Sequence, residues 1–201
     1  MAARHAAVLA IVLFAAGTSL TAQIPQLPAP SAAEPILREI VAVQAFEDRV
    51  GQYVLQHRLL ESTVPPLQPT RDVRQIDMAV QALAVRIRLA RAGARQGDLI
   101  TPEVGLVFRR RIATCLTPVE WAAVLAENAE EAEGEASGLL RVNMAWPEPA
   151  VFGFVPPQML AALPRLPDEL QYRIIGNALV LWDHHANLIV DFLPDAFAAL
   201  T

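Results

Sequence analysis

The densest group of side chains that could do chemistry is the run Asp183-His184-His185-Ala186-Asn187. Imidazole nitrogens and carboxylate oxygens are the ligands that zinc, copper and nickel accept in proteins. Asp183, His184 and His185 are therefore the candidate metal ligands of this chain. The same run also has the composition of a hairpin turn, in which Asp and Asn bind their own backbone. Neighbouring residues of a strand point to opposite faces, and this favours the turn over a metal site.

Two other residues invite a chemical role. His57 lies on the apolar stripe of a predicted helix, which indicates a hydrogen-bonded side chain at the edge of the core rather than a base. Cys115 is the single cysteine, so a disulfide within the chain and a multi-cysteine metal site are excluded. No set of nucleophile, base and orienting residue occurs at a recognisable spacing. We therefore expect no cofactor, and the interpretation leans against an enzyme.

All sixteen basic residues are arginine, because the chain contains no lysine. Mechanisms that need a side-chain amine, such as Schiff-base chemistry or a Walker-type phosphate loop, are thereby excluded. Guanidinium groups suit phosphate and carboxylate, and they are concentrated in residues 71–111. The candidates for binding an anion or a partner are Arg88, Arg91, Arg95, Arg109, Arg110 and Arg111. The alternative is a solvated face balanced by the acidic residues 112–148.

The N-terminus predicts export. Residues 1–22 combine a charged start, a short apolar run and small residues up to Ala22, which is typical of a secretory signal peptide. The apolar run is too short to span a bilayer. We therefore expect a periplasmic or secreted mature chain without a membrane span. Its partners should not include nucleic acid, because the chain carries a net charge of −5.

Helices are predicted for the first half of the chain. Residues 23–35 are rich in proline and predict an extended leader. In the helical region 36–133, apolar residues recur every three or four positions over 36–60 and 73–94, which predicts two helices paired as a hairpin. Two further helices are predicted to begin at Thr101, followed by Pro102, and at Thr117, followed by Pro118. The second helix of the hairpin is predicted to begin at Thr70.

The C-terminal part changes to a strand pattern. Residues 134–169 form a Pro/Gly-rich connection with a short helix, and residues 170–201 contain three runs rich in β-branched and aromatic residues. Gly176-Asn177 is a two-residue hairpin signal between the first two runs. The predicted fold is therefore α+β and mainly helical, ending in a small three-stranded antiparallel β-meander.

This C-terminal region also carries a family resemblance. Its residues Leu163-Pro164-Arg165-Leu166-Pro167, Tyr172-Arg173-Ile174-Ile175-Gly176 and the following strand–turn–strand to Asp191 are similar to the tail of uncharacterised exported bacterial proteins. The resemblance implies export and no assigned activity. The favoured interpretation is a non-enzymatic exported module that binds another exported protein or an anionic ligand. The alternative is a periplasmic metal-handling protein or small hydrolase that uses the Asp183-His184-His185 turn.

Overall fold

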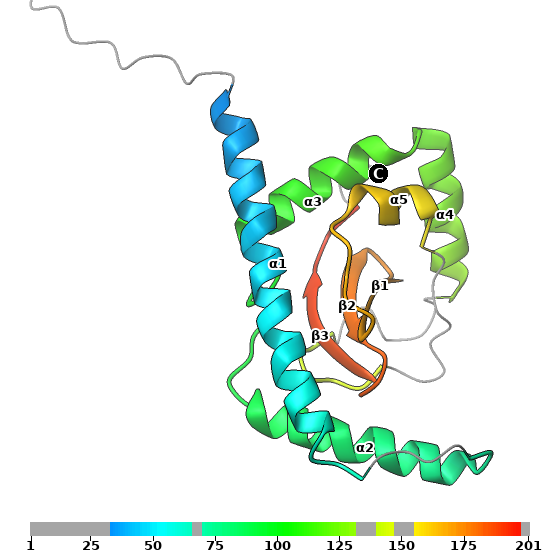
Figure 1. The fold of residues 1–201 in the computed structure, drawn as a ribbon. Coiled ribbons are helices and arrows are strands. Elements are labelled where there is room, and N and C mark those ends of the chain that lie inside the picture. The colour runs from blue at the N-terminus through cyan, green and yellow to red at the C-terminus, as the bar shows by residue number, and fades with distance from the viewer. Residues whose placement is uncertain (1–32, 66–69, 132–139, 147–154, 198–201) are drawn as a thin grey trace, which may run out of the picture. The chain divides into compact units, whose positions relative to one another are not determined.

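The computed structural model describes residues 33–65, 70–131, 140–146 and 155–197. The predicted signal peptide and most of the predicted leader lie outside these residues. The mainly helical α+β fold is confirmed (Figure 1): five helices precede one three-stranded antiparallel sheet. The elements are α1 (Ala33–Glu61), α2 (Val73–Ala90), α3 (Pro102–Cys115), α4 (Pro118–Glu131), α5 (Pro157–Ala162), β1 (Leu170–Ile175), β2 (Ala178–Asp183) and β3 (Leu188–Leu193). None of the described helices is long and apolar enough to cross a membrane.

Two of the predicted helix starts are confirmed by their capping hydrogen bonds. The side chain of Thr101 accepts a hydrogen bond from the backbone N–H of Val104 at the start of α3. At the start of α4, Glu120 Oε2 accepts from Thr117 N over 2.7 Å and Thr117 Oγ1 accepts from Glu120 N over 3.4 Å. This reciprocal pair is the capping box that the sequence predicts.

Two other helix starts differ from the prediction. The N-cap of α2 is Asp72, not Thr70, because the Asp72 carboxylate accepts the backbone N–H of Arg74. Thr70 instead accepts the backbone N–H of Asp72. The proline-rich leader ends earlier than predicted, since α1 begins at Ala33. Pro35 fits there because the first turn of a helix needs no N–H donor at that position.

The sheet places its middle strand between two apolar layers. Ile175 pairs with Ala178 across the predicted Gly176-Asn177 turn, and Gly176 adopts a φ of 53°, which glycine tolerates without strain. All six residues of β2 are buried. Leu179 and Leu181 belong to the main core with the helices. Val180 and Trp182 belong to a smaller cluster on the other face of the sheet.

The helices around the sheet cover α1 unevenly. Figure 1 shows α1 along one side of the sheet, α3 and α5 above it, and α2 across the C-terminal end of α1. Phe46 in the middle of α1 packs edge-on against Phe108 of α3, with 5.1 Å between the ring centroids. Ile36 and Ile40, which the apolar spacing assigns to the buried stripe, are exposed. The middle of α1 is therefore covered by α3. α2 does not lie along α1 over its length, as the predicted helical hairpin would require.

Candidate metal centre

Three polar side chains lie one helical turn apart on α1. Tyr53, His57 and Glu61 follow one another at intervals of four residues, so they share one face of the helix. This face looks toward the turn between β2 and β3, where Asp183 lies. His57 is only 1% exposed, whereas Glu61 lies at the last residue of the helix and is half-exposed. The row therefore runs from the core to the surface.

Asp183, the last residue of β2, ties this row to the sheet. Its Oδ2 accepts a hydrogen bond from the Tyr53 hydroxyl over 2.5 Å and lies 2.6 Å from His57 Nδ1. Its Oδ1 accepts the backbone N–H of Ala186 over 2.9 Å and so closes the turn. Because a carboxylate oxygen faces Nδ1, that nitrogen carries a proton, and in the neutral ring the Nε2 of His57 presents its lone pair.

The electrostatics of this group follow from its burial. Burial by itself lowers the pKa of His57, but the hydrogen bond to Asp183 and the nearby carboxylates raise that pKa above its ordinary value. Burial acts to raise the pKa of Asp183, yet the hydrogen bonds from His57 and Tyr53 hold it below its usual range. Burial and Asp183 together raise the pKa of Tyr53, so its phenol remains protonated.

The Nε2 atom of His57 faces two more potential ligands. It is buried, has no hydrogen-bond partner in the part of the chain that the structure describes, and lies 3.5 Å from Glu61 Oε2. His185 Nδ1 lies 3.5 Å from Glu61 Oε1, and the ligand atoms of all three residues lie within 4.8 Å of one another. Two ligands about 2.1 Å from a tetrahedral zinc ion stand about 3.4 Å apart. Each 3.5 Å separation is close to this spacing, but the two end on different oxygens of Glu61, so the three residues lie near one another without forming a complete tetrahedral set.

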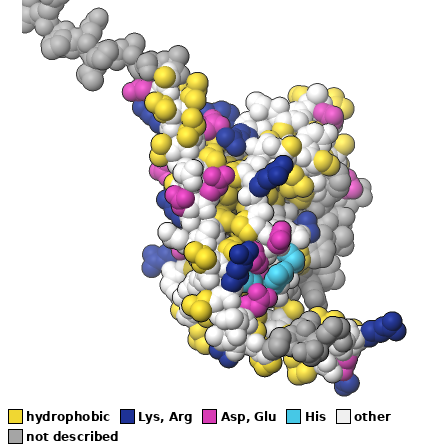
Figure 2. All heavy atoms as spheres, viewed as in Figure 1, with side chains coloured by type: hydrophobic (Ala, Val, Ile, Leu, Met, Phe, Trp, Pro, Cys, Tyr) yellow, Lys and Arg dark blue, Asp and Glu magenta, His cyan; other side chains and the backbone are white. Residues whose placement is uncertain are grey.

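The surroundings of these ligands are acidic. Glu169, at the N-terminal end of β1, is 5% exposed, and its Oε1 accepts a hydrogen bond from Arg58 Nε over 2.5 Å. Its Oε2 is buried without a hydrogen-bond partner. Glu61, Asp183 and Glu169 thus place three carboxylates near His57, while two guanidinium groups lie beside them: Arg58 pairs with Glu169, and Arg91 lies over the Tyr53 ring. Figure 2 shows histidine side chains at the surface between acidic side chains, with arginine beside them.

The metal ligands predicted from the sequence have to be revised. Of Asp183, His184 and His185, only His185 belongs to the cluster of three. His184 and His185 both lie in the turn after β2, where their rings pack edge-on with 4.6 Å between the centroids, so the divergence expected from strand alternation is not found. They differ in their partners, since His184 Nε2 lies 2.6 Å from the carbonyl oxygen of Asp168. Asp183 orients His57 instead of offering a ligand atom. Sequence reasoning missed Glu61, although its position four residues after His57 on a helix could have indicated a shared site.

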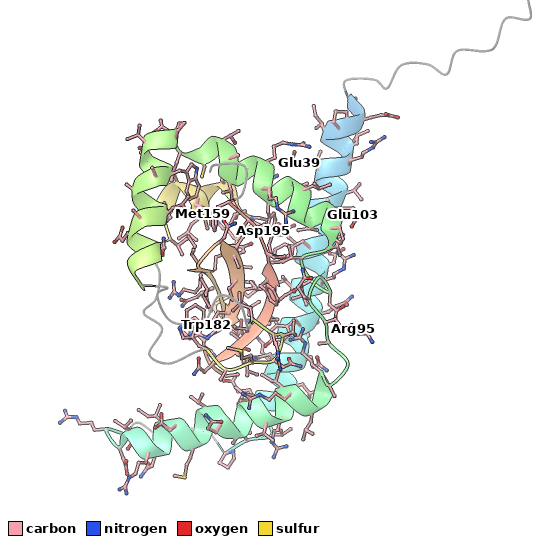
Figure 3. The ribbon with its side chains drawn as sticks, turned by 180° about the vertical axis from the view of Figure 1, so that it is seen from behind. Glu39, Arg95, Glu103, Met159, Trp182 and Asp195 are labelled. Carbon is pink, nitrogen blue, oxygen red and sulfur yellow. The ribbon has the colours of Figure 1, made fainter. Side chains whose placement is uncertain are left out.

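The six candidate arginines bind different parts of the molecule. Arg88 and Arg91 donate hydrogen bonds to Asn143, and Arg91 also to the carbonyl oxygen of Val190. Arg109 donates to the carbonyl oxygens of Pro194 and Asp195, whereas Arg110 and Arg111 pair with Glu39 of α1. Figure 3 shows Arg95 in the loop that follows α2, well separated from Glu39 on α1. Among the described residues these side chains therefore do not converge on one anion site, and their anion binding stays a prediction.

Cys115 has the environment of a structural thiol. Its Sγ donates a hydrogen bond to the carbonyl oxygen of Ile112, and burial raises its pKa above the ordinary value. Both effects keep the sulfur protonated, which suppresses nucleophilic reactivity.

No family model matches the chain, and no curated protein or solved structure matches it.

Proposed function

We propose that this protein binds a divalent transition-metal ion of the zinc type through His57 Nε2, Glu61 and His185. One observation carries the proposal: the buried Nε2 of His57 has no hydrogen-bond partner among the described residues, while Asp183 holds the other ring nitrogen. A metal-binding histidine characteristically donates its second N–H to a carboxylate, which fixes the tautomer and orients the ring. His57 has this second interaction, which leaves its Nε2 as the atom that would bind the ion.

The cost of burial supports the same conclusion. A buried polar atom without a partner destabilises the fold by about 1–3 kcal/mol. A bound ion would give Nε2 the partner that neither Glu61, at 3.5 Å, nor another described residue supplies. The ion would also offset the excess negative charge of Glu61, Asp183 and Glu169 over Arg58 and Arg91.

The donor set indicates the class of metal. Two imidazole nitrogens and one carboxylate oxygen suit zinc, nickel or copper, whereas calcium and magnesium require six or more oxygen ligands. Zinc fits best because it accepts nitrogen and oxygen donors, and the separations found here are close to its tetrahedral spacing.

The exposure of the ligands supports metal handling rather than a structural role. Structural zinc sites use four protein ligands, and this cluster offers three. The side chains of Glu61 and His185 are 44% and 37% exposed, so an ion would be reached directly from solvent. A site of this kind can take up and release metal without unfolding the chain.

Calorimetric titration of the metal-free protein with zinc tests the proposal. We expect one ion per chain, with an affinity that falls at least about tenfold in His185→Ala and Glu61→Gln. His184→Ala is the comparison variant, because it removes the neighbouring imidazole, whose Nε2 faces Asp168 and which lies outside the cluster. Its ring packs edge-on against His185, so we expect a smaller loss of affinity than in His185→Ala rather than none. Cobalt titration followed by visible absorption reports the coordination geometry independently.

Two outcomes would overturn the proposal. One is the absence of stoichiometric binding by the wild-type protein. The other is an equal loss of affinity in His184→Ala and His185→Ala, because this would indicate nonspecific binding to exposed imidazoles. Circular dichroism of each variant separates a lost ligand from a lost fold.

A further inference from the structure

The outer face of α2 carries an apolar stripe that no described residue covers. Met78, Val85 and Leu89 are 64%, 50% and 73% exposed, and Ala82 lies between them along the helix. We call Met78, Ala82, Val85 and Leu89 the outer stripe. The opposite face of α2 is already used, since Leu83, Ala84 and Ile87 are buried in the core. α2 is therefore apolar on two faces, only one of which has a partner within the chain.

The spacing of the outer stripe is that of a helix–helix seam. Its four residues are separated by four, three and four positions, which is the alternation of a and d residues in a coiled coil. Asp77, Gln81 and Arg86 flank the stripe and line the same shallow groove. Figure 1 shows α2 at the periphery of the fold, with its N-terminal turns extending past the sheet.

We propose that the outer stripe is a self-association surface, on which the α2 of a second copy of this chain packs in antiparallel orientation. Around a two-fold axis between Ala82 and Val85, Met78 of each helix meets Leu89 of the other, and Ala82 meets Val85. The two central layers then combine a smaller residue, Ala82, with a larger one, Val85, and the two outer layers pair Met78 with Leu89, which are similar in size. A two-fold pair uses the same patch on both copies, so the surface is complete without any other partner.

A parallel pair of the same helices fits less well. It sets Ala82 against Ala82, which leaves a void in the middle of the seam. The antiparallel pair places Asp77, in the first half of α2, toward Arg88, in the second half and on the same flank of the stripe, so that opposite charges approach each other. Arg88 also donates a hydrogen bond to Asn143 within its own chain.

The length of the stripe sets the strength of the contact. One seam of four layers buries less than the roughly 800 Å² per partner of a stable interface. We therefore expect a reversible dimer that dissociates in the micromolar range, about 1–100 µM. The outer stripe and the metal ligands lie on different helices, so this inference does not depend on metal binding.

Sedimentation equilibrium of the full chain, followed over protein concentration, tests the proposal. The wild-type protein should pass from monomer to dimer, and Leu89→Arg should shift the dissociation constant at least tenfold toward monomer. Leu106→Arg is the matched control, because Leu106 lies on α3, outside the stripe, and is exposed to 64%. Thermal melts establish that both variants fold.

Disulfide trapping tests the orientation. In a Cys115→Ser background, chains carrying Ala82→Cys are mixed with tagged chains carrying Val85→Cys and then oxidised mildly. The antiparallel pair predicts cross-links between the two kinds of chain and few between two Ala82→Cys chains. A wild-type protein that remains monomeric at several hundred micromolar, or a dimer that Leu89→Arg leaves intact, overturns the proposed surface. Efficient cross-linking of Ala82→Cys to itself overturns the antiparallel orientation.

Discussion

Asp183 and Asp191 are two fully buried aspartates on neighbouring strands, and they are used in opposite ways. The carboxylate of Asp191 is surrounded by backbone: within 2.8–2.9 Å it accepts the N–H groups of Gly97, Leu99, Ile100 and Phe192. Asp191 thereby fixes the loop that leads into α3. The carboxylate of Asp183 is instead bound by side chains of α1, one of which is a histidine with a second, unused nitrogen.

The difference shows in the two pKa values. Burial raises the pKa of Asp191 above its ordinary value, even though four backbone donors act against this effect. Asp183 is equally inaccessible to solvent, yet its pKa is held below the ordinary value by His57 and Tyr53. Burial alone therefore does not mark a functional carboxylate. The distinguishing feature is a titratable partner, His57, whose second ring nitrogen makes no hydrogen bond to the described residues.

The largest effect that we expect is on folding, from Asp191→Asn. Each carboxylate oxygen accepts two backbone N–H groups, so replacing either oxygen by the amide NH₂ leaves two buried N–H groups without an acceptor and facing a donor. We expect the free energy of unfolding to fall by about 3 kcal/mol or more, because each such group costs about 1–3 kcal/mol. Urea denaturation measures the change. Zinc affinity, measured on the folded fraction, should stay within about twofold, and a large loss would contradict the separation of the two aspartates.

The next largest effect concerns the metal itself. At a free zinc concentration one hundred times the dissociation constant, the free energy of unfolding should rise by about 2.7 kcal/mol. Thermal denaturation with and without a chelator measures this gain. Glu61→Gln should lose most of it, while Asp191→Asn should retain it despite its lower starting stability. If zinc raised the free energy of unfolding equally in the wild type and in Glu61→Gln, the ion would bind at a site that does not include Glu61.

A smaller loss of stability, with a clear loss of binding, is expected for Asp183→Asn. The amide oxygen can still accept from Tyr53, so we expect a loss of about 1–2 kcal/mol in the free energy of unfolding. Zinc affinity should fall by about 10–100-fold, because the amide orients His57 less firmly and makes it a weaker base. The pairing of chemical denaturation with calorimetry gives both values. Unchanged affinity would reduce Asp183 to a structural role like that of Asp191.

The smallest effect is expected from Arg58→Gln. This substitution removes a positive charge, 59% exposed, beside the proposed ligands, and its repulsion of a bound ion is worth about 0.2–1 kcal/mol because solvent screens it. The substitution also takes the ion-pair partner from the buried Glu169. Zinc should therefore bind about 2–5 times more tightly to the variant, with the difference shrinking in high salt. Arg38→Gln, on the remote end of α1, should change nothing. Weaker binding by Arg58→Gln would show that Arg58 supports the site by holding Glu169.

Local signals predicted much of the fold. Thr101, Thr117 and the Gly176-Asn177 turn act through contacts within a few residues, so each could be recognised from its neighbours alone. The start of α2 shows the limit of such signals, since Thr70 and Asp72 are both good caps and only their hydrogen bonds distinguish them.

The candidate site was only partly predictable for a different reason. His185 was identified from its own turn, but its partners His57 and Glu61 come from the other end of the chain. Their proximity depends on how α1 docks on the sheet, which no local pattern encodes. The apolar spacing of α1 likewise predicted a buried stripe and could not show that Ile36 and Ile40 extend beyond the covering helices.

The hydrogen bond between His57 and Asp183 joins residues that are 126 positions apart in the chain. During synthesis, α1 leaves the ribosome long before the strand that completes its binding face, and closing so long a loop is entropically costly until the sheet exists. The ligands on α1 alone amount to one histidine and one glutamate, which cannot hold an ion firmly. Under the proposed function, metal would therefore be loaded last in the maturation of the chain, after β2 and β3 have docked on α1.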